Sequence, residues 1–261
     1  MTDFEILEIL ISAERESAEL MREAHGVMAE CKTGRRDVVT EYDRRVQELM
    51  MLRIRENVPG AAFFCEESDR RDDINAEHMF IIDPIDGTMN FVHSLNHSCI
   101  SAAYMSRGEL RAAAIYNPYV DELFTAVKGQ GAKLNGAPIH TADGSLSENL
   151  CVCGTAPYNM ELLDRTFALM KAACTAALDI RRQGSAALDL CTAAAGRAGV
   201  YFELQTSLWD FAAGKLIVEE AGGICLDIDG NEMPLDGAKS SVLAGSHECV
   251  KEFLAIAKRI N

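Results

Sequence analysis

An apolar run that ends in two closely spaced acids is the feature that most constrains this chain. The segment MFIIDPIDGTMNF, residues 79–91, leads from a strand-like apolar run directly into Asp83 and Asp86. Two carboxylates this close at the end of a buried strand repel each other and lose solvation, so they destabilise the fold unless a positive group lies between them. A divalent cation is the simplest such group. The segment therefore predicts a strand that ends in a metal site.

The residues around the two acids predict that an anion binds beside the metal. Pro84 fixes its own φ and holds Asp83 in an extended conformation, which turns both acids toward a common point. Gly87 allows a sharp bend, and a helical turn begins at Thr88. Backbone N–H groups at such a helix start bind phosphate well. The alternative is an ordinary Asp-Pro turn in which Asp86 caps a helix.

Four further acids lie where separate elements can converge on the same point. Glu66 and Glu67 end the apolar run AAFFC, Asp43 opens a predicted helix, and Asp210 opens another in SLWDFAAGKLIVEEAGG. Carboxylates without a histidine or cysteine cluster favour hard cations, so we expect Mg²⁺ rather than zinc. The alternative for Asp210 is a first-turn acid that complements the helix dipole.

Length and charge limit the classes of partner. The chain has 261 residues, 48% of them hydrophobic, and a formal net charge of −15. The length fits one large domain or two closely joined ones. The acidic balance argues against nucleic acid and against an anionic membrane as partners, because both bind basic surfaces. An acidic chain can still bind a small anionic substrate where metal ions reverse the local field.

The N-terminal residues and the cysteines predict a cytoplasmic protein. The segment MTDFEILEILISAERESAEL carries acids where a secretory signal needs positive charge, and its apolar residues are periodic rather than continuous. The nine cysteines include no CxxC pair. We expect reduced and mostly buried thiols, with a disulfide or zinc framework as the alternative.

Hydrophobic periodicity predicts an α+β protein whose pattern changes near residues 145–150. Helices are expected over residues 4–30, 43–55, 159–177, 185–196, 208–221 and 247–260. Strands are expected within residues 61–68, 78–88, 98–106, 110–117, 121–127, 131–140, 148–156, 177–183, 198–204, 223–228 and 241–245. We therefore predict an N-terminal α+β half, residues 1–147, and a C-terminal α/β half, residues 148–261, which together form one compact catalytic unit.

Five segments in order resemble the inositol monophosphatase family of magnesium-dependent, lithium-sensitive phosphatases. They are KTGRRDVVTEYD, CEES, DPIDGTMNFVH, RRQGSAALDLC and WDFAAGKLIVEEAGG. The resemblance runs from about residue 5 to residue 255 and implies a layered αβαβα sandwich of mixed and antiparallel sheets, assembled as a homodimer. Cys65 departs from the family pattern, because it stands where the family usually has glycine before the two glutamates.

The resemblance also implies a set of metal ligands. Glu66, Asp83 and the carbonyl of Ile85 would bind a first Mg²⁺ ion. Asp83 would bridge to a second ion, which Asp86 and Asp210 would also bind. Glu66 would reach a third ion through water.

Catalytic and substrate-binding roles follow from the same resemblance. Glu67 and Thr88 would orient or activate the attacking water, with Asp43 hydrogen-bonded behind Thr88. The N–H groups of Gly87 and Thr88 would hold the phosphate, next to Asp86 and Asp210. The substrate hydroxyl groups would face Gly184, Ala186, Glu203 and Thr155.

The implied reaction is Mg²⁺-dependent hydrolysis of inositol 1-phosphate, with inhibition by lithium. Glu203 favours a polyol, because a carboxylate there can accept hydrogen bonds from ring hydroxyls. The alternatives are fructose 1,6-bisphosphate, another sugar phosphate, histidinol phosphate, a nucleotide 3′-phosphate or NADP. A bisphosphate would need a basic residue nearby, for which Arg181, Arg182 and Lys215 are candidates. A protein of another class, a non-catalytic binding protein on this scaffold, is a further alternative.

Overall fold

The computed structural model describes residues 1–34, 37–68, 71–157 and 159–260. Its helices are α1 (Asp3–Arg22), α2 (Glu41–Asn57), α3 (Thr88–Val92), η1 (Leu146–Glu148), η2 (Met160–Leu162), α4 (Leu163–Ala176), α5 (Ala186–Ala194), α6 (Leu208–Glu220) and α7 (His247–Ala257). Its strands are β1 (Glu30–Gly34), β2 (Asp37–Val39), β3 (Ala62–Cys65), β4 (Met79–Asp86), β5 (Cys99–Ser106), β6 (Glu109–Asn117), β7 (Glu122–Val127), β8 (Ala132–Leu134), β9 (Ala137–Pro138), β10 (Leu150–Cys153), β11 (Asp179–Arg181), β12 (Val200–Thr206), β13 (Ile224–Leu226) and β14 (Ser240–Gly245).

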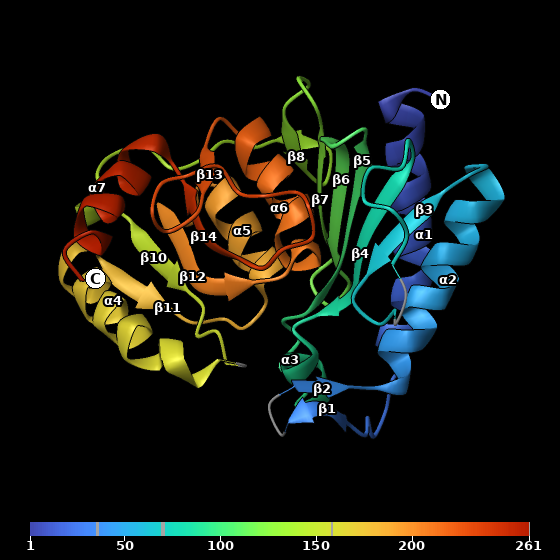
Figure 1. The fold of residues 1–261 in the computed structure, drawn as a ribbon, viewed down its shortest axis with the longest axis horizontal. Helices are drawn as coiled ribbons and strands as arrows, with labels where there is room; N and C mark the ends of the chain where they lie inside the picture. The colour runs from blue at the N-terminus through green and yellow to red at the C-terminus, as the bar shows by residue number, and fades with distance from the viewer. Residues whose placement is uncertain (35–36, 69–70, 158, 261) are drawn as a thin grey trace.

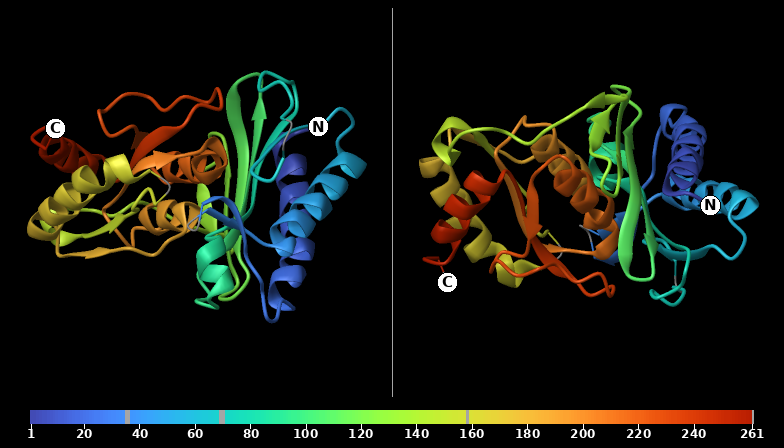
Figure 2. Two further views of the ribbon diagram at one scale, coloured as in Figure 1. Left: turned by 60° about the horizontal axis from the view of Figure 1, so that its bottom comes forward. Right: turned by 90° about the horizontal axis from the view of Figure 1, so that it is seen from above.

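Helices and sheets alternate as layers along the long axis of the molecule. Figure 1 shows α1 and α2 outside a first sheet, α5 and α6 between the two sheets, and α4 and α7 outside the second. The two views in Figure 2 show the same order. The chain termini lie in opposite outer layers. This arrangement confirms the predicted αβαβα sandwich.

The first sheet has seven strands in the order β3-β4-β5-β6-β7-β8-β9. Strand β3 is parallel to β4, and every later neighbour is antiparallel, as the predicted meander requires. The second sheet has five strands in the order β11-β10-β12-β14-β13, with β10 parallel to both neighbours and β14 antiparallel to both of its own. Mixed sheets covered on both faces by helices bury their strands, which explains the long apolar runs.

Helices α5 and α6 pack closely because a glycine lies at their contact. A Cβ atom on Gly214 of α6 would lie 2.5 Å from Cδ1 and 2.6 Å from Cβ of Leu190 in α5. The small residues Ala212 and Ala213 beside it are buried as well. The two helices therefore pack against each other in one central layer that contacts both sheets.

Two predictions about the N-terminal region were wrong. The first helix ends at Arg22 rather than near residue 30, because Gly26 adopts a φ of +63° that a helix cannot continue through. Met28, which the periodic pattern placed on the helix face, is 85% exposed. The segment after it forms the hairpin of β1 and β2, which the sequence pattern did not predict.

The cysteines were predicted to be reduced and mostly buried. All nine cysteines are free thiols, and seven of them are buried. Among the helices of the described residues, none is both long enough and apolar enough to cross a bilayer.

Candidate active site

A β-bulge in β4 turns Asp83 and Asp86 toward the same face of the first sheet. Asp83 lies opposite Ser101 of β5 and Asp86 lies opposite Cys99, so three steps on β4 match two steps on β5. In a regular strand, residues three apart point to opposite faces. The extra residue of the bulge removes this difference and brings both carboxylates to the side of the central helices. Asp83 and Asp86 were predicted to face a common point, and the bulge is what turns them to the same side.

The start of α5 holds the carboxylate of Asp86. Oδ2 of Asp86 accepts hydrogen bonds from the hydroxyl of Ser185 and, at 2.7 Å, from the backbone N–H of Ala187. The thiol of Cys99 lies 3.9 Å from the same oxygen. Ser185 caps α5 and was missed as a site residue, although it belongs to the quoted segment RRQGSAALDLC. These contacts fix Asp86 beside the positive end of a helix dipole.

Asp83 and Asp210 complete a group of acids that act on one another. Asp83 is 2% exposed, and Asp210, in the first turn of α6, accepts a hydrogen bond of 2.6 Å from the N–H of Ser207. Burial raises the pKa of Asp83 well above its usual value, and the charges of Glu66, Asp86 and Asp210 raise it further. Burial also raises the pKa of Asp210, with Asp86 and Glu66 adding to it. The charges of four predicted metal ligands therefore act on one another: Glu66, Asp83, Asp86 and Asp210.

Lys32, on β1, contacts both glutamates that follow β3. Its Nζ lies 2.9 Å from Oε1 of Glu66 and also forms an ion pair with Glu67. Burial raises the pKa of Glu66 to about 7, and the attraction of Lys32 opposes that rise. Lys32 opens the family-like segment KTGRRDVVTEYD, from which no role was predicted for it. Its ammonium group supplies positive charge where the carboxylates of Glu66 and Glu67 come together.

Thr88, at the start of α3, lies between Asp43 and the carbonyl of Ile85. Its Oγ1 is 3.1 Å from Oδ1 of Asp43 and 3.0 Å from the oxygen of Ile85. Asp43 is fully buried and accepts hydrogen bonds from Thr40 through its other oxygen, because the two residues form the capping box of α2. The contact that the resemblance implied between Asp43 and Thr88 is present.

Gly87 lets the chain turn tightly between β4 and α3. Its φ is +88°, and a Cβ atom there would lie 3.1 Å from the carbonyl oxygen of His97, 3.2 Å from that of Gly184 and 3.3 Å from Cβ of Ser185. Both the conformation and the close approach require glycine. The turn therefore brings the start of α3 directly against the segment that precedes α5.

The predicted substrate-side residues come from that segment and from the second sheet. Gly184 and Ala186 flank Ser185, while Glu203 lies on β12 and is 9% exposed. Its Oε1 accepts from the N–H of Ala156 at 2.8 Å, and its Oε2 accepts from the hydroxyl of Tyr201 at 2.9 Å. Each carboxylate oxygen has two lone pairs, so Glu203 retains capacity for a substrate hydroxyl.

The donor set fits a hard divalent cation. In the described part of the chain, no three His, Cys, Asp or Glu side chains are gathered closely enough to form a ready metal cluster. The acids nevertheless raise one another's pKa values, as described above for Asp83 and Asp210. Buried carboxylates with mutually raised pKa values are stabilised by a cation, and oxygen donors select Mg²⁺ or Ca²⁺. The residues present therefore fit the predicted metal.

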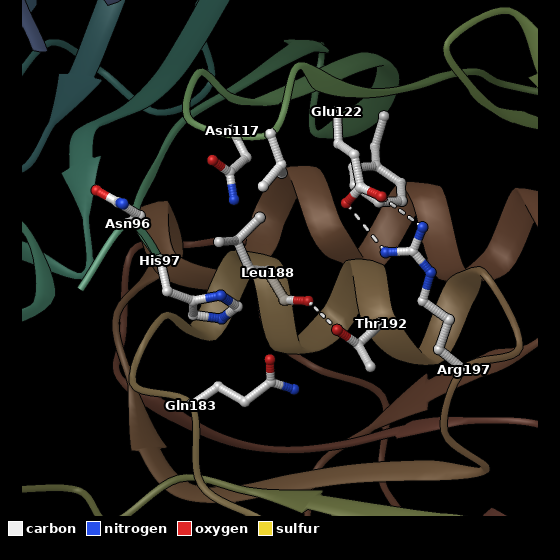
Figure 3. Close-up of a pocket in the computed structure, with 10 residues that line it drawn as sticks. Asn96, His97, Asn117, Glu122, Gln183, Leu188, Thr192 and Arg197 are labelled. Atoms are coloured by element: carbon white, nitrogen blue, oxygen red, sulfur yellow. Dashed lines mark hydrogen bonds and ion pairs between the residues drawn. The ribbon is translucent and has the colours of Figure 1, made fainter. Parts of the chain in front are cut away.

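A separate cavity of about 360 Å³ lies beside the segments that precede β5 and α5. The amide of Asn90 connects these two segments, since it donates to the carbonyls of His97 at 2.7 Å and Gln183 at 2.9 Å. Figure 3 shows Arg197 and Glu122 paired at one end of the cavity and His97 at the other. None of the six predicted acids lines it, so the cavity is distinct from the candidate active site. Its lining residues are Asn96, His97, Asn117, Val120, Glu122, Phe124, Gln183, Leu188, Thr192 and Arg197.

Comparisons with known proteins identify the family of this chain. Residues 3–260 match the model of the inositol monophosphatase family. The Nus factor SuhB of Pasteurella multocida is 35% identical over 253 residues, which cover 95% of this chain and 94% of that protein. The crystal structure of the extragenic suppressor protein suhB from Bartonella henselae superposes with a TM-score of 0.91, at 28% identity over 98% of this chain and 99% of that one. The structure of inositol monophosphatase from Anabaena gives a TM-score of 0.87, at 29% identity over 98% of this chain and 96% of that one. The chain belongs to the inositol monophosphatase family.

Proposed function

We propose that this chain is a Mg²⁺-dependent phosphate monoester hydrolase whose substrate is inositol 1-phosphate. The observation that carries the proposal is the bulge in β4, which turns Asp83 and Asp86 to one face of the sheet, where Asp86 contacts the start of α5. Family membership and the Anabaena relative, which is named an inositol monophosphatase, support the same reaction.

The metal-binding residues are those that the family resemblance assigns. Glu66, Asp83, Asp86, Asp210 and the carbonyl of Ile85 would hold the Mg²⁺ ions. When bound, Mg²⁺ acidifies water and neutralises the phosphate oxygens and the leaving oxygen. Lys32 contacts only Oε1 of Glu66, so Oε2 remains available to a metal ion.

The remaining residues orient water, phosphate and polyol. Thr88 has one hydroxyl hydrogen, which it donates to Asp43 or to Ile85, so its lone pairs can accept from the attacking water. Glu67 accepts the proton of that water. The N–H groups of Gly87 and Thr88 hold the phosphate, while Gly184, Ala186 and Glu203 face the hydroxyl groups.

A binding role on the same scaffold is the second candidate. It is favoured by one observation, that the Pasteurella multocida relative carries the name Nus factor. The net charge of −15 opposes direct contact with nucleic acid. We therefore propose that the protein is a cytoplasmic homodimer that acts on a small-molecule substrate and is inhibited by lithium. We propose neither a nucleic-acid nor a membrane partner.

Phosphate release from a panel of inositol, sugar and nucleotide phosphates, with and without Mg²⁺, tests the proposal. We expect Mg²⁺-dependent turnover that is fastest on inositol 1-phosphate. Asp86→Asn and Asp210→Asn should each lower kcat by about a thousandfold or more, because each removes a charge that holds the metal. Asp164→Asn, on the exposed face of α4, is the control and should retain activity.

Two results would contradict the proposal. One is an absence of phosphate release from every ester in the panel, which would favour the binding role. The other is near-normal Mg²⁺-dependent turnover in Asp86→Asn or Asp210→Asn. Circular dichroism and thermal unfolding of the variants would show whether the fold is retained.

A further inference from the structure

The only tryptophan of the chain, Trp209, directly precedes the predicted metal ligand Asp210. Both residues lie in the first turn of α6, where Oδ2 of Asp210 accepts a hydrogen bond of 2.6 Å from the N–H of Ser207. This bond belongs to the capping box of α6, so the carboxylate is tied to the start of its own helix. The same helical turn therefore positions the indole of Trp209 and the carboxylate of Asp210.

An arginine and a phenylalanine from another part of the chain lie against this indole. Cζ of Arg71 is 4.5 Å from the centre of the Trp209 ring and 4.7 Å from the centre of the Phe64 ring. The two rings are 5.7 Å apart, with 37° between their planes. A guanidinium this close to an aromatic face is attracted by the ring quadrupole, most strongly by that of tryptophan. Arg71 therefore holds Trp209 and Phe64 together.

The backbone next to Arg71 is bonded to β3. The N–H of Asp72 donates to the carbonyl of Phe63 at 3.1 Å, and Oδ2 of Asp72 accepts from the N–H of Phe63 at 2.8 Å. Phe64 is the next residue of this strand, and Glu66 directly follows the end of the strand. Arg71 is therefore fixed relative to the strand that leads into Glu66.

The ring of Phe64 is also in contact with the loop that leads into β14. Phe64 is 6% exposed, and a Cβ atom on Gly237 would lie 2.9 Å from its Cζ. The ring cannot shift toward this loop without displacing the backbone of the loop. Phe64 therefore offers Arg71 and Trp209 a fixed surface.

These contacts join the two segments that carry Glu66 and Asp210. Mg²⁺ requires its oxygen ligands at about 2.0–2.1 Å in near-octahedral geometry. A small displacement of the start of α6 relative to the end of β3 would therefore weaken metal binding without removing any ligand.

A second arginine makes a matching contact on the other face of β3. Cζ of Arg55 lies 4.8 Å from the centre of the Phe63 ring. Phe63 packs with residues of α1 and α2, whereas Phe64 packs with residues of α5 and α6. The contact of Arg55 therefore has the same chemistry but lies on the face of the sheet away from Asp210.

We propose that Arg71 is a positioning residue for Mg²⁺ binding, which holds the indole of Trp209 against Phe64 and thereby fixes Asp210 relative to Glu66. The inference rests on the metal-binding residues of the proposed function and adds to them a residue that is not itself a ligand. Because Trp209 adjoins Asp210, its fluorescence should change when Mg²⁺ binds.

Titration of the full-length protein with MgCl₂ in the absence of substrate tests the proposal. The fluorescence of Trp209 and isothermal titration calorimetry give two independent values of the apparent Kd for Mg²⁺. Arg71→Met keeps an unbranched side chain but removes the guanidinium. We expect it to raise this Kd about fivefold, because the contact with the indole is lost. At saturating Mg²⁺ its kcat should stay within about twofold of the wild-type value, since every ligand is still present.

Two further variants separate this role from a general loss of packing. Arg71→Lys should recover part of the affinity, because an ammonium group is attracted to an aromatic face but does not stack on it. Arg55→Met, which removes the matching contact on the other face of β3, should leave the Kd for Mg²⁺ unchanged.

The outcomes distinguish this inference from the hydrolase proposal. An unchanged Kd in Arg71→Met, or an equal rise in Arg55→Met, would overturn the role of Arg71 and leave the hydrolase proposal intact. A wild-type protein that binds Mg²⁺ but hydrolyses no ester would overturn only the hydrolase proposal. A wild-type protein that binds no Mg²⁺ would overturn both.

Discussion

Gly87 is the residue on which the geometry of the candidate site depends most closely. Gly87→Ala should reduce activity at least about a hundredfold, because the added Cβ would press on the carbonyls of His97 and Gly184 and displace the start of α3. The left-handed conformation alone should cost roughly 1–2 kcal/mol of stability.

Gly108→Ala provides the control for this prediction. Gly108 has a similar φ, +81°, but a Cβ atom there would contact nothing within 4 Å. Both variants should therefore lose similar stability in thermal unfolding, whereas only Gly87→Ala should lose phosphatase activity. Comparable activity losses in the two variants would show that backbone strain, and not the approach to Gly184, is what matters.

At the scale of single residues, the sequence predicted the acids of the site better than the neighbouring groups that hydrogen-bond to them. Asp83 and Asp86 could be found because acids at the end of an apolar run are unusual. Ser185 gave no comparable indication, since a serine before a helix is an ordinary cap. The contact of Ser185 with Asp86 depends on how α5 packs against β4, which no local pattern encodes.

Helix α1 carries a buried acid that has no evident role in catalysis. Glu14 is fully buried, and neither carboxylate oxygen has a hydrogen-bond partner among the described residues. Burial raises the pKa of Glu14 well above its usual 4.5. The folded state therefore binds this proton more tightly than the unfolded state, and the protein loses stability as the pH rises above 4.5 toward the raised pKa.

Glu14→Met should remove this destabilisation. We expect the variant to be more stable than the wild type by about 1–3 kcal/mol at pH 8, with a smaller difference near pH 4.5, because the wild-type side chain is protonated there. Thermal unfolding across this range measures the difference. Glu8→Met, at an exposed position of the same helix, should show little pH dependence. A constant difference at all pH values would mean that Glu14 does not titrate as proposed.

Element boundaries illustrate which parts of the fold were predictable. The strands from β5 to β9 follow apolar segments separated by clear turns such as Asn135-Gly136, so the meander was confirmed. The hairpin of β1 and β2 was missed because its strands are short and mostly polar. Residues 35 and 36, which belong to the family-like segment KTGRRDVVTEYD, lie outside the described residues.

At the scale of the whole molecule, α5 and α6 contact each other closely and lie between the two sheets, each in contact with both. Gly214→Ala should lower stability by about 1–3 kcal/mol, because its Cβ would overlap Leu190. It should also lower activity, since Ser185 at the start of α5 and Asp210 at the start of α6 both belong to the site.

A second substitution tests whether the effect is transmitted by this contact. Leu190→Ala combined with Gly214→Ala should recover part of the lost activity, because it removes the overlapping side chain. Thermal unfolding and kcat of the two single variants and the double variant complete the cycle. Additive losses would show that the distance between the helices does not set the geometry of the site. The division into halves at residues 147 and 148 remains a prediction, since one central layer serves both sheets.

The bulge between Asp83 and Asp86 has a consequence for how this protein can change over evolutionary time. Exchanging the side chain of Ile85 leaves the number of backbone steps intact, whereas losing that codon would leave the two acids two steps apart on one face of a regular strand and would remove the Ile85 carbonyl that faces Thr88. Lineages that keep the acids should therefore tolerate substitution within this interval but never a change in its length.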